Sequence, residues 1–251
     1  MSTVIKALSL LDHFNARSPE FGLVEMAKAA DLDKATTRRL LVALAAKGFI
    51  EQDAATRRYR LGAALVRLAR LREAHFPLID IARPIAEALS ESSGETVHVS
   101  EIAGDVLASV LVRESAFANR VSVDIGEKLP FNCTASGLAF LSAAPELLLA
   151  AVLKGPLRKV TPNSITSVAQ FRKQIEATRA LGYAFSDQGF EDGVVSVAAP
   201  ILGANGLAVG AISIASPAVR ADAAAVKRHA TAVKEAARRI SLSLGGRAPA
   251  V

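Results

Sequence analysis

Apolar positions in the first fifty residues recur every three to four residues and are interrupted by short polar breaks. The pattern predicts three helices, over residues 4–14, 23–30 and 34–47. The third carries the sequence DKATTRRLL at its start, where Asp33 is a strong N-cap candidate. Leu40, Leu41, Leu44 and Ala45 form its apolar stripe, so Thr36, Thr37 and Arg38 are expected near its exposed N-terminal end.

The period changes from helical to alternating after residue 48. Two short strands are predicted, over 49–52 and 58–61, joined by the polar turn 53–56. Three helices followed by a basic hairpin predict a winged helix-turn-helix over residues 1–62. A helix over 63–74, with Leu65, Leu68 and Leu71 expected inside, is interpreted as a linker spanning residues 63–76.

The remaining residues, 77–251, predict a second domain in which helices and strands are mixed. Strands are expected over 97–102, 106–113, 121–123, 183–186, 194–201 and 207–215, and helices over 78–92, 135–143, 146–153, 168–181 and 222–244. Asn205-Gly206 is a strong hairpin turn between the last two strands. Consecutive strands with short turns predict an antiparallel sheet flanked by helices, an α+β fold.

Charge is concentrated at one place in the chain. Residues 34–72 hold ten basic and two acidic side chains, a net +8, whereas the whole chain carries +6 and the rest therefore sums to −2. Such a stretch suggests a polyanionic partner, although a solvated basic face is the alternative. A single cysteine, no secretory pattern at the N-terminus and no apolar run long enough for a membrane span favour a cytoplasmic protein that does not bind membranes.

No constellation for catalysis or metal binding is found in the sequence. Cys133 has no neighbouring base in FNCTASG and is interpreted as inert packing, and the four histidines lack metal-ligand spacing. Nucleophile-elbow, phosphate-loop, zinc-protease and dinucleotide motifs are missing from the sequence. We therefore predict no enzyme activity, no metal and no cofactor.

Several stretches together carry a family resemblance over almost the whole chain. These are KALSLLDHF, LDKATTRRLLVALAAKGFI and RRYRLG in the first domain, and SGETVHVSEIAG, DIGEKLPFNCTASGLAFLSA, ALGYAFSD, GVVSVAAPI and AISIASP in the second. In this order and spacing the chain resembles IclR-type bacterial transcriptional regulators. The resemblance implies a winged helix-turn-helix followed by a GAF-like domain that binds a small-molecule effector. It also implies homodimers or homotetramers that bind palindromic operators in double-stranded DNA.

The start of the third helix and the hairpin have the chemistry of a DNA-binding surface. A helix N-terminus offers free N–H groups, short hydroxyls contact phosphate or bases, and arginine can fork onto guanine. The candidate contacts are Lys34, Thr36, Thr37, Arg38, Arg39, Arg57 and Arg58. Arg38 is the candidate for base contact and Arg39 for phosphate. Ala35 replaces a serine that is frequent in the resembling family and so removes one possible hydroxyl contact. Thr36 and Lys34 are therefore expected to contribute more of the contact with DNA.

The resemblance also implies an effector pocket on one face of the second domain's sheet. By matching segments, the candidates are Ala135, Ser136, Ser186, Ser196 and Ser213. The first two would offer backbone N–H groups at a helix start, which suits a carboxylate. Ser186 and Ser196 replace residues more usual in the family. The alternative for Ser136, Ser196 and Ser213 is that they are small packing residues.

Together these features predict a DNA-binding regulator whose operator binding is modulated by a small metabolite, with an organic acid as the first candidate. A different class remains open at this point: a GAF-like small-molecule-binding protein or enzyme whose basic N-terminal unit contacts protein or membrane. Steep salt dependence and preference for a specific duplex would separate the two.

Overall fold

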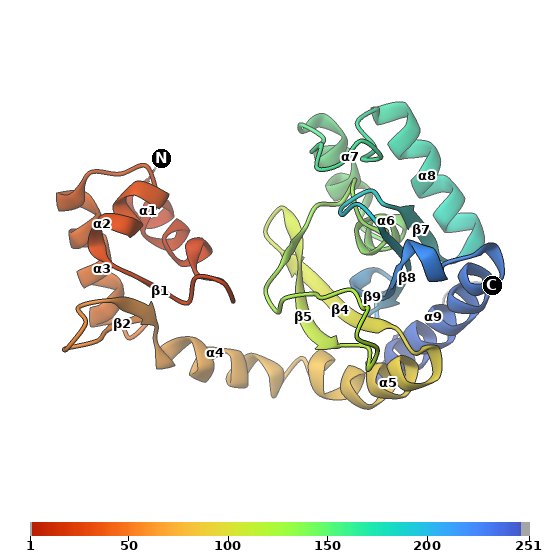
Figure 1. Ribbon diagram of the computed structural model, residues 1–251, viewed down its shortest axis with the longest axis horizontal. Coiled ribbons are helices and arrows are strands. Elements are labelled where there is room, and N and C mark those ends of the chain that lie inside the picture. The colour runs from red at the N-terminus through yellow and green to blue at the C-terminus, as the bar shows by residue number, and fades with distance from the viewer. Residues whose placement is uncertain (1, 247–251) are drawn as a thin grey trace. The chain divides into compact units, whose positions relative to one another are not determined.

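The computed structural model describes residues 2–246, which form two compact units divided between Phe76 and Pro77 (Figure 1). The first unit contains the predicted helices and hairpin. In chain order its elements are α1 (Thr3–Ser9), the 3₁₀ turn η1 (Leu11–His13), β1 (Glu20–Phe21), α2 (Leu23–Ala29), α3 (Lys34–Ala46), β2 (Ile50–Gln52), β3 (Tyr59–Leu61) and α4 (Ala63–Glu73). The winged helix-turn-helix prediction is confirmed.

A small core holds the helices of the first unit against its sheet. Leu40, Leu41 and Leu44 of α3 pack with Met26 of α2 and Leu10 between α1 and η1, while Ile50 and Tyr59 close the core from the hairpin. The sheet has the antiparallel order β1-β3-β2. The two-residue strand β1 was not predicted, since so short a segment leaves no alternation to detect.

Two glycines fix the path from α3 through the hairpin to α4. Gly48 has φ of +72°, which lets the chain leave α3 and turn into β2. Gly62 lies so close to Gly48 that any side chain there would collide with the Gly48 carbonyl oxygen. The Ala64 N–H donates to that same oxygen at 3.0 Å, which fastens the first turn of α4 to the end of α3.

The prediction that Leu65, Leu68 and Leu71 of α4 are buried is wrong within the described residues. No residue of α4 is buried in this part of the chain, and Val66 and Leu71 are 63% and 57% exposed. Beyond its fastened first turn, α4 adds no side chain to the core of its own unit. The helix therefore presents apolar side chains that the unit itself does not cover.

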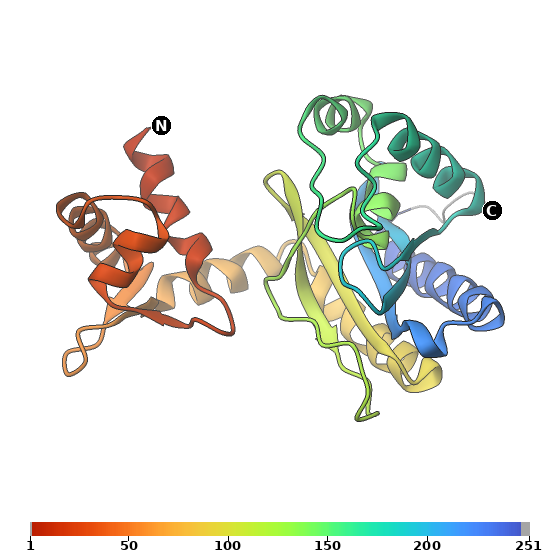
Figure 2. The same cartoon turned by 45° about the horizontal axis from the view of Figure 1, so that its top comes forward.

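The second unit is a three-layer α+β domain, as predicted. In chain order it contains α5 (Leu78–Ser93), β4 (Thr96–Ala103), β5 (Val106–Arg113), β6 (Lys128–Leu129), α6 (Ala135–Ser142), α7 (Glu146–Lys154), α8 (Val168–Leu181), β7 (Ala184–Asp187), β8 (Val194–Leu202), β9 (Ala208–Pro217), the 3₁₀ turn η2 (Ala218–Arg220) and α9 (Ala223–Ser243). Its strands form one antiparallel sheet in the order β6-β5-β4-β9-β8-β7. Helices cover both faces of the sheet (Figures 1 and 2).

Alternating side chains of the central strands divide the core into two clusters. Val97, Val99 and Ile214 face α5 and α9, in a cluster rich in Val, Ile and Leu. The other face packs Ala198 and Ala211 against α6 and α8 and is populated by smaller side chains. Small residues on this face leave room for a cavity above the sheet.

One predicted strand is wrong, and it lies next to that cavity. Residues 121–123 have no strand conformation, and the strand that pairs with β5 is β6 instead. The carbonyl oxygen of Val121 accepts a 2.6 Å hydrogen bond from the hydroxyl of Thr96, a side chain on β4. The segment is thus an irregular loop that is held by a side-chain hydrogen bond. The alternating residues Val121, Ser122 and Val123 line the cavity instead of forming a strand.

Candidate DNA-binding surface and effector cavity

The N-terminus of α3 is capped as the sequence predicts. Asp33 has extended backbone angles, and its carboxylate accepts a 2.8 Å hydrogen bond from the Thr36 N–H. This hydrogen bond is the main reason that the pKa of Asp33 lies below its ordinary value. The cap fixes where the helix begins and hence which side chains occupy its first exposed turn.

Basic side chains of that turn are open to solvent. Lys34, Arg38 and Arg39 are exposed, and Thr36 is half-buried. They are four of the seven residues that sequence reasoning assigned to DNA contact, and the helix holds them within six consecutive positions. The exposed Ala35 lies among them and offers only a methyl group.

Thr37 does not belong to this surface, and its assignment as a DNA contact is corrected. Its side chain is completely buried, and its hydroxyl donates to the Asp33 carbonyl oxygen at 2.9 Å. Thr37 precedes Leu40, Leu41 and Leu44 by three, four and seven residues, so it continues the buried stripe of α3 by one turn. The residue stabilises the start of the helix from inside.

In the hairpin, here called the wing (residues 50–61), the two predicted DNA contacts Arg57 and Arg58 have different surroundings. Arg57 is exposed at the turn and has φ of 60°, a conformation that the Asp53 carboxylate supports by accepting from the Thr56 N–H at 2.7 Å. Gln52 adds a bond from its side-chain amide to the Arg57 carbonyl oxygen at 2.9 Å. Arg57 therefore projects from a turn with a defined shape.

Arg58 is paired within its own unit, but its side chain is 38% exposed, so its DNA contact stays a prediction. Its guanidinium lies 2.7 Å from the Glu25 carboxylate and donates to the Glu20 carbonyl oxygen at 3.0 Å. Glu25 in turn accepts from the Gly22 N–H, and this bond and Arg58 both lower its pKa. The network ties β3 to the start of α2.

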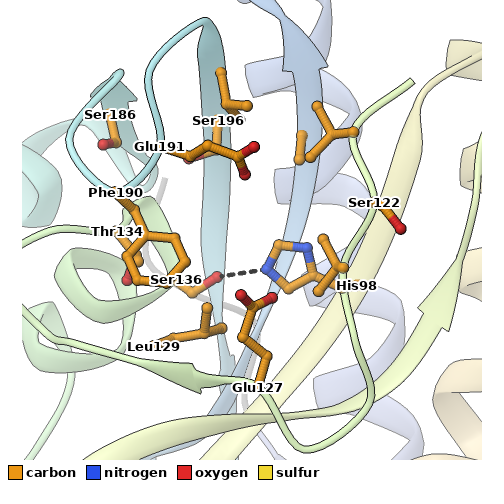
Figure 3. Close-up of a pocket in the computed structure, with 14 residues that line it drawn as sticks. His98, Ser122, Glu127, Leu129, Thr134, Ser136, Ser186, Phe190, Glu191 and Ser196 are labelled. Carbon is orange, nitrogen blue, oxygen red and sulfur yellow. Dashed lines mark hydrogen bonds between the residues drawn. The ribbon is translucent and has the colours of Figure 1, made fainter. Parts of the chain in front are cut away.

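The second unit contains a cavity on the α6 side of the sheet, with a volume of about 40 Å³. Its floor is the central strands, with His98 on β4, Ser196 on β8 and Ala215 on β9. Its walls are the start of α6 and two segments, residues 121–129 and 186–194, which include β6 and the ends of β7 and β8 (Figure 3). This volume holds a few water molecules or a small organic molecule.

Three of the five predicted effector residues line this cavity: Ser136, Ser186 and Ser196. They come from α6, β7 and β8, which are far apart in sequence, so the fold gathers them. The Ser186 hydroxyl donates to the Cys133 carbonyl oxygen at 3.1 Å, and the Ser136 hydroxyl lies 3.3 Å from Nε2 of His98. Ser136 also stands in the first turn of α6, which Thr134 caps by accepting from the Gly137 N–H.

The other two predicted residues, Ala135 and Ser213, are not among the residues that line the cavity, and the predicted role of Ala135 concerns its backbone N–H group at the start of α6. Both are fully buried. Ala135 packs in the apolar cluster under α6, and the Ser213 hydroxyl donates to the Val197 carbonyl oxygen at 3.2 Å. Ser213 pairs with His98 of β4 and lies two residues before Ala215 on β9, which is one of the floor strands, but it is not among the residues that line the cavity.

His98 is the cavity residue that sequence reasoning missed most clearly. Only 6% of its surface is exposed, its Nε2 faces Ser136, and its Nδ1 is buried with no hydrogen-bond partner among the described residues. Burial lowers the pKa of His98 to about 4, so the ring is neutral near pH 7. Its position on the cavity side of β4 follows from the alternation of Val97, His98 and Val99, which was the available signal.

Two carboxylates in the cavity wall were also missed, Glu127 and Glu191. Figure 3 shows both turned toward the space beside Ser136 and His98. They lie on loops, so no periodicity marks them.

The loop of residues 114–127, which carries part of the cavity wall, is fastened by Arg220. The Arg220 guanidinium makes a bidentate pair with the Glu95 carboxylate, with both N–O distances 2.8 Å, and Glu95 is only 6% exposed. A third N–H donates to the Asn119 carbonyl oxygen at 2.8 Å, and the guanidinium carbon lies 5.2 Å from the centre of the Phe117 ring. We refer to these four residues as the Arg220 clasp.

The second unit also contains a buried cysteine, Cys133, and a second hollow. Cys133 is buried, burial raises the pKa of its thiol, and the thiol contacts the Arg158 carbonyl oxygen at 3.4 Å. The hollow, about 460 Å³, lies beside α7 and includes none of the predicted effector residues. Within residues 2–246 no helix is long and apolar enough to cross a membrane, and no acidic, His and Cys side chains gather as a metal site.

A winged helix-turn-helix followed by an α+β domain with a small-molecule cavity defines a ligand-binding transcriptional regulator. Comparison with protein families agrees: the IclR helix-turn-helix domain matches residues 3–54, and the bacterial transcriptional regulator IclR C-terminal domain matches residues 73–242. The chain belongs to the IclR family of transcriptional regulators, which are not enzymes. The resemblance drawn from sequence motifs is thereby confirmed.

Relatives match over nearly the full length. The glycerol operon regulatory protein of Streptomyces coelicolor is 30% identical, over 96% of this chain and 95% of the relative. The crystal structure of an IclR-type regulator from Silicibacter sp. TM1040 is 39% identical, with a TM-score of 0.88 over 99% of this chain and 98% of that one. An IclR homologue from Microbacterium hydrocarbonoxydans, crystallised with 4-hydroxybenzoate, shares the fold at 22% identity and a TM-score of 0.80, over 97% and 99%.

Proposed function

We propose that this regulator binds a palindromic operator as a homo-oligomer, and that a small organic acid in the α6 cavity modulates its affinity for DNA. The observation that carries the DNA part is the exposed basic first turn of α3. There Lys34, Arg38 and Arg39 surround a capped helix N-terminus, where backbone N–H groups and side-chain charge both attract phosphate. Arg57 at the tip of the wing adds a further backbone contact.

Roles within the turn follow from side-chain reach and exposure. Arg38 is proposed to contact a base edge, because a guanidinium can donate two parallel hydrogen bonds to guanine. Lys34, Thr36, Arg39 and Arg57 are proposed to contact phosphates, which fixes the register of α3 in the major groove. Thr37 supports this surface from behind, and the exposed part of Arg58 is proposed as a further phosphate contact.

Exposed apolar side chains support self-association. Val66 and Leu71 on α4 are exposed. In the same unit, α1 also has exposed apolar side chains: Val4, Ile5 and Leu8 are 67%, 54% and 49% exposed. Clusters of apolar side chains on a small unit mark interaction sites. We propose that α4 packs on a second copy of the chain, because a two-fold dimer matches the two half-sites of a palindrome.

The start of α6 supports an acidic effector. The backbone N–H groups of Ala135 and Ser136 donate to no acceptor among the described residues. The dipole of α6 favours negative charge at this end of the helix. A carboxylate beside Ser136 would accept from the helix N-terminus and from the serine hydroxyl. That the Microbacterium homologue was crystallised with an aromatic acid agrees with this class of ligand.

Coupling between the two functions requires a difference in effector affinity between two arrangements of the regulator. We propose that the effector favours one spacing of the paired winged helices over another, and that α4 and its packing transmit the difference. Effector and operator then change each other's affinity by the same factor.

DNA pull-down with sequencing tests the proposal. Genomic fragments retained by the full-length protein should share a palindrome, and a duplex carrying it should outcompete random DNA. Its affinity should fall by about two decades or more between 50 and 200 mM salt, because several phosphates are neutralised per subunit. If no duplex competes better than random DNA, the regulator reading of the basic surface fails, and a protein or membrane partner becomes the better explanation.

A metabolite screen on the selected duplex then tests the effector part. Small carboxylic acids should change the affinity for the duplex, and a cavity-filling Ser196→Phe should remove the response. The Val219→Phe variant is the control, since Val219 is 86% exposed and does not line the cavity. An acid response that survives in Ser196→Phe would place the effector elsewhere.

A further inference from the structure

The tip of the wing, residues 53–58, extends beyond the small sheet of the first unit. Pairing between β1 and β3 ends at Tyr59, the residue next to the tip. The hydrogen bonds between Asp53 and Thr56, and the bond from the Asp53 N–H to the Arg58 carbonyl oxygen, all lie within the hairpin. These bonds define the shape of the tip, but they do not fix its position relative to the helices.

The Arg58 side chain is the one polar tie between the wing tip and the rest of the unit among the described residues. Its guanidinium donates to the Glu25 carboxylate at 2.7 Å and to the Glu20 carbonyl oxygen at 3.0 Å. Glu25 is itself held in place, because its carboxylate also accepts from the Gly22 N–H at 2.9 Å at the start of α2. The tip is therefore fastened to α2 through the Glu25–Arg58 pair.

The same part of α2 is packed against α3. Met26, the residue after Glu25, is fully buried in the core with Leu40 and Leu41 of α3. A continuous set of contacts thus connects the wing tip, through Arg58 and α2, to the helix whose first turn is proposed to bind DNA. The Glu25 carboxylate by itself would repel DNA phosphates, so any contribution of Glu25 in favour of DNA binding has to come from position.

We propose that Glu25 is a positioning residue for DNA binding, which holds Arg58 and thereby sets the position of the wing tip relative to the first turn of α3. The inference rests on the proposed DNA contacts of Arg57 and α3. When the tip is held, Arg57 reaches a phosphate at the same time as α3 lies in the major groove. When Glu25 is removed, the tip has to be ordered at the moment of binding, and that ordering reduces affinity.

The expected effect is modest because the pair is open to solvent. The side chains of Arg58 and Glu25 are 38% and 55% exposed, and an exposed ion pair shifts an equilibrium by up to about fivefold. Release of the tip also removes no more affinity than the Arg57 contact supplies. We therefore expect Glu25→Gln to weaken DNA binding by about threefold, although it removes a negative charge from a DNA-binding unit.

Fluorescence anisotropy with the full-length protein tests the inference, and Glu51→Gln is the matched control. Glu51 is a 45% exposed carboxylate in the same hairpin, and it pairs with Arg60 of the adjacent strand rather than with α2. Glu25→Gln should bind DNA about threefold more weakly than Glu51→Gln. Arg57→Ala should weaken the native protein by about threefold or more but Glu25→Gln by less than about twofold, because both substitutions remove the same contact.

The positioning role is overturned if Glu25→Gln binds as tightly as Glu51→Gln, or if Arg57→Ala costs the same with and without Glu25. Arg58→Met is the second variant, since it leaves the Glu25 bond to the Gly22 N–H intact. It should reduce the effect of Arg57→Ala in the same way, and an unreduced effect would also overturn the role.

The outcomes separate this inference from the proposed function. A native protein that prefers no duplex over random DNA refutes the proposed regulator. The same variants compared on random DNA still test Glu25, because contacts to phosphates need no particular base sequence.

Discussion

Removing the arginine of the Arg220 clasp should destabilise the second unit and loosen the cavity wall. In Arg220→Leu, the Glu95 carboxylate loses a bidentate partner at 2.8 Å while remaining 6% exposed. Breaking a buried ion pair from one side costs about 3–5 kcal/mol, because the remaining charge is left without a partner. The Arg220 side chain is 30% exposed, so water screens part of the loss and the lower end, about 3 kcal/mol, is expected.

Urea denaturation and thermal melting measure this loss. For a unit of this size, about 3 kcal/mol corresponds to a fall in Tm of roughly 6–12 °C. Amide hydrogen exchange should rise in residues 114–127, since Arg220 also holds the Asn119 carbonyl oxygen and the Phe117 ring. Exchange in the central strands should rise only as much as the global stability requires.

A double variant shows whether the buried charge is the cause. Arg220→Leu/Glu95→Leu removes both charges and should recover most of the lost free energy of unfolding, because no carboxylate remains buried. The reasoning is refuted if Arg220→Leu costs less than about 1 kcal/mol, or if the double variant is no more stable than the single one.

Three further predictions concern other parts of the molecule. Thr37→Val should lower the free energy of unfolding by about 0.5–1.5 kcal/mol through loss of the hydroxyl bond to Asp33, while the DNA affinity of the folded protein changes less than twofold; a large loss of affinity would restore Thr37 as a contact. Because the pKa of His98 is lowered to about 4 in the folded state, only the unfolded chain takes up this proton as the pH falls from 6.5 toward 4. Stability should therefore be lost over that range by up to about 3 kcal/mol more than in His98→Gln, and equal pH profiles of the two proteins would contradict the burial argument. Leu71→Glu should shift the sedimentation of the protein toward the monomer, whereas Val219→Glu should not; an unchanged distribution would exclude α4 as the interface.

Periodicity predicted the framework of both units because their helices and strands bury one face. The apolar stripe of α3, the Asp33 cap and the two clusters around the central sheet all follow from spacing. The errors occur where tertiary contacts decide. Residues 121–123 alternate as a strand does, but their partner is the Thr96 hydroxyl rather than a neighbouring strand.

Site residues were predictable in part. The three serines that line the cavity were found by resemblance, and His98 was recoverable from the alternation of β4. Ser213 failed because exposure to a cavity depends on which neighbouring side chains are small, and Glu191 was missed because the path of a loop has no sequence period. Thr37 on α3 was misassigned for a related reason. Its hydroxyl could contact DNA, but the buried face of α3 extends one turn beyond Leu40 toward the N-terminus and includes Thr37.

The central claim, that the first turn of α3 reads DNA, is tested most directly by fluorescence anisotropy on the selected duplex and on a scrambled one. We predict that Arg38→Ala costs about 1–3 kcal/mol on the selected duplex and less on the scrambled one, so that the ratio of the two affinities falls. Arg39→Ala should weaken both duplexes similarly, and Arg172→Ala, an exposed arginine on α8, should change neither. An equal loss on both duplexes for Arg38→Ala would leave it a phosphate contact, and unchanged affinities for both Arg38→Ala and Arg39→Ala would contradict the assignment of α3 as the DNA-reading element.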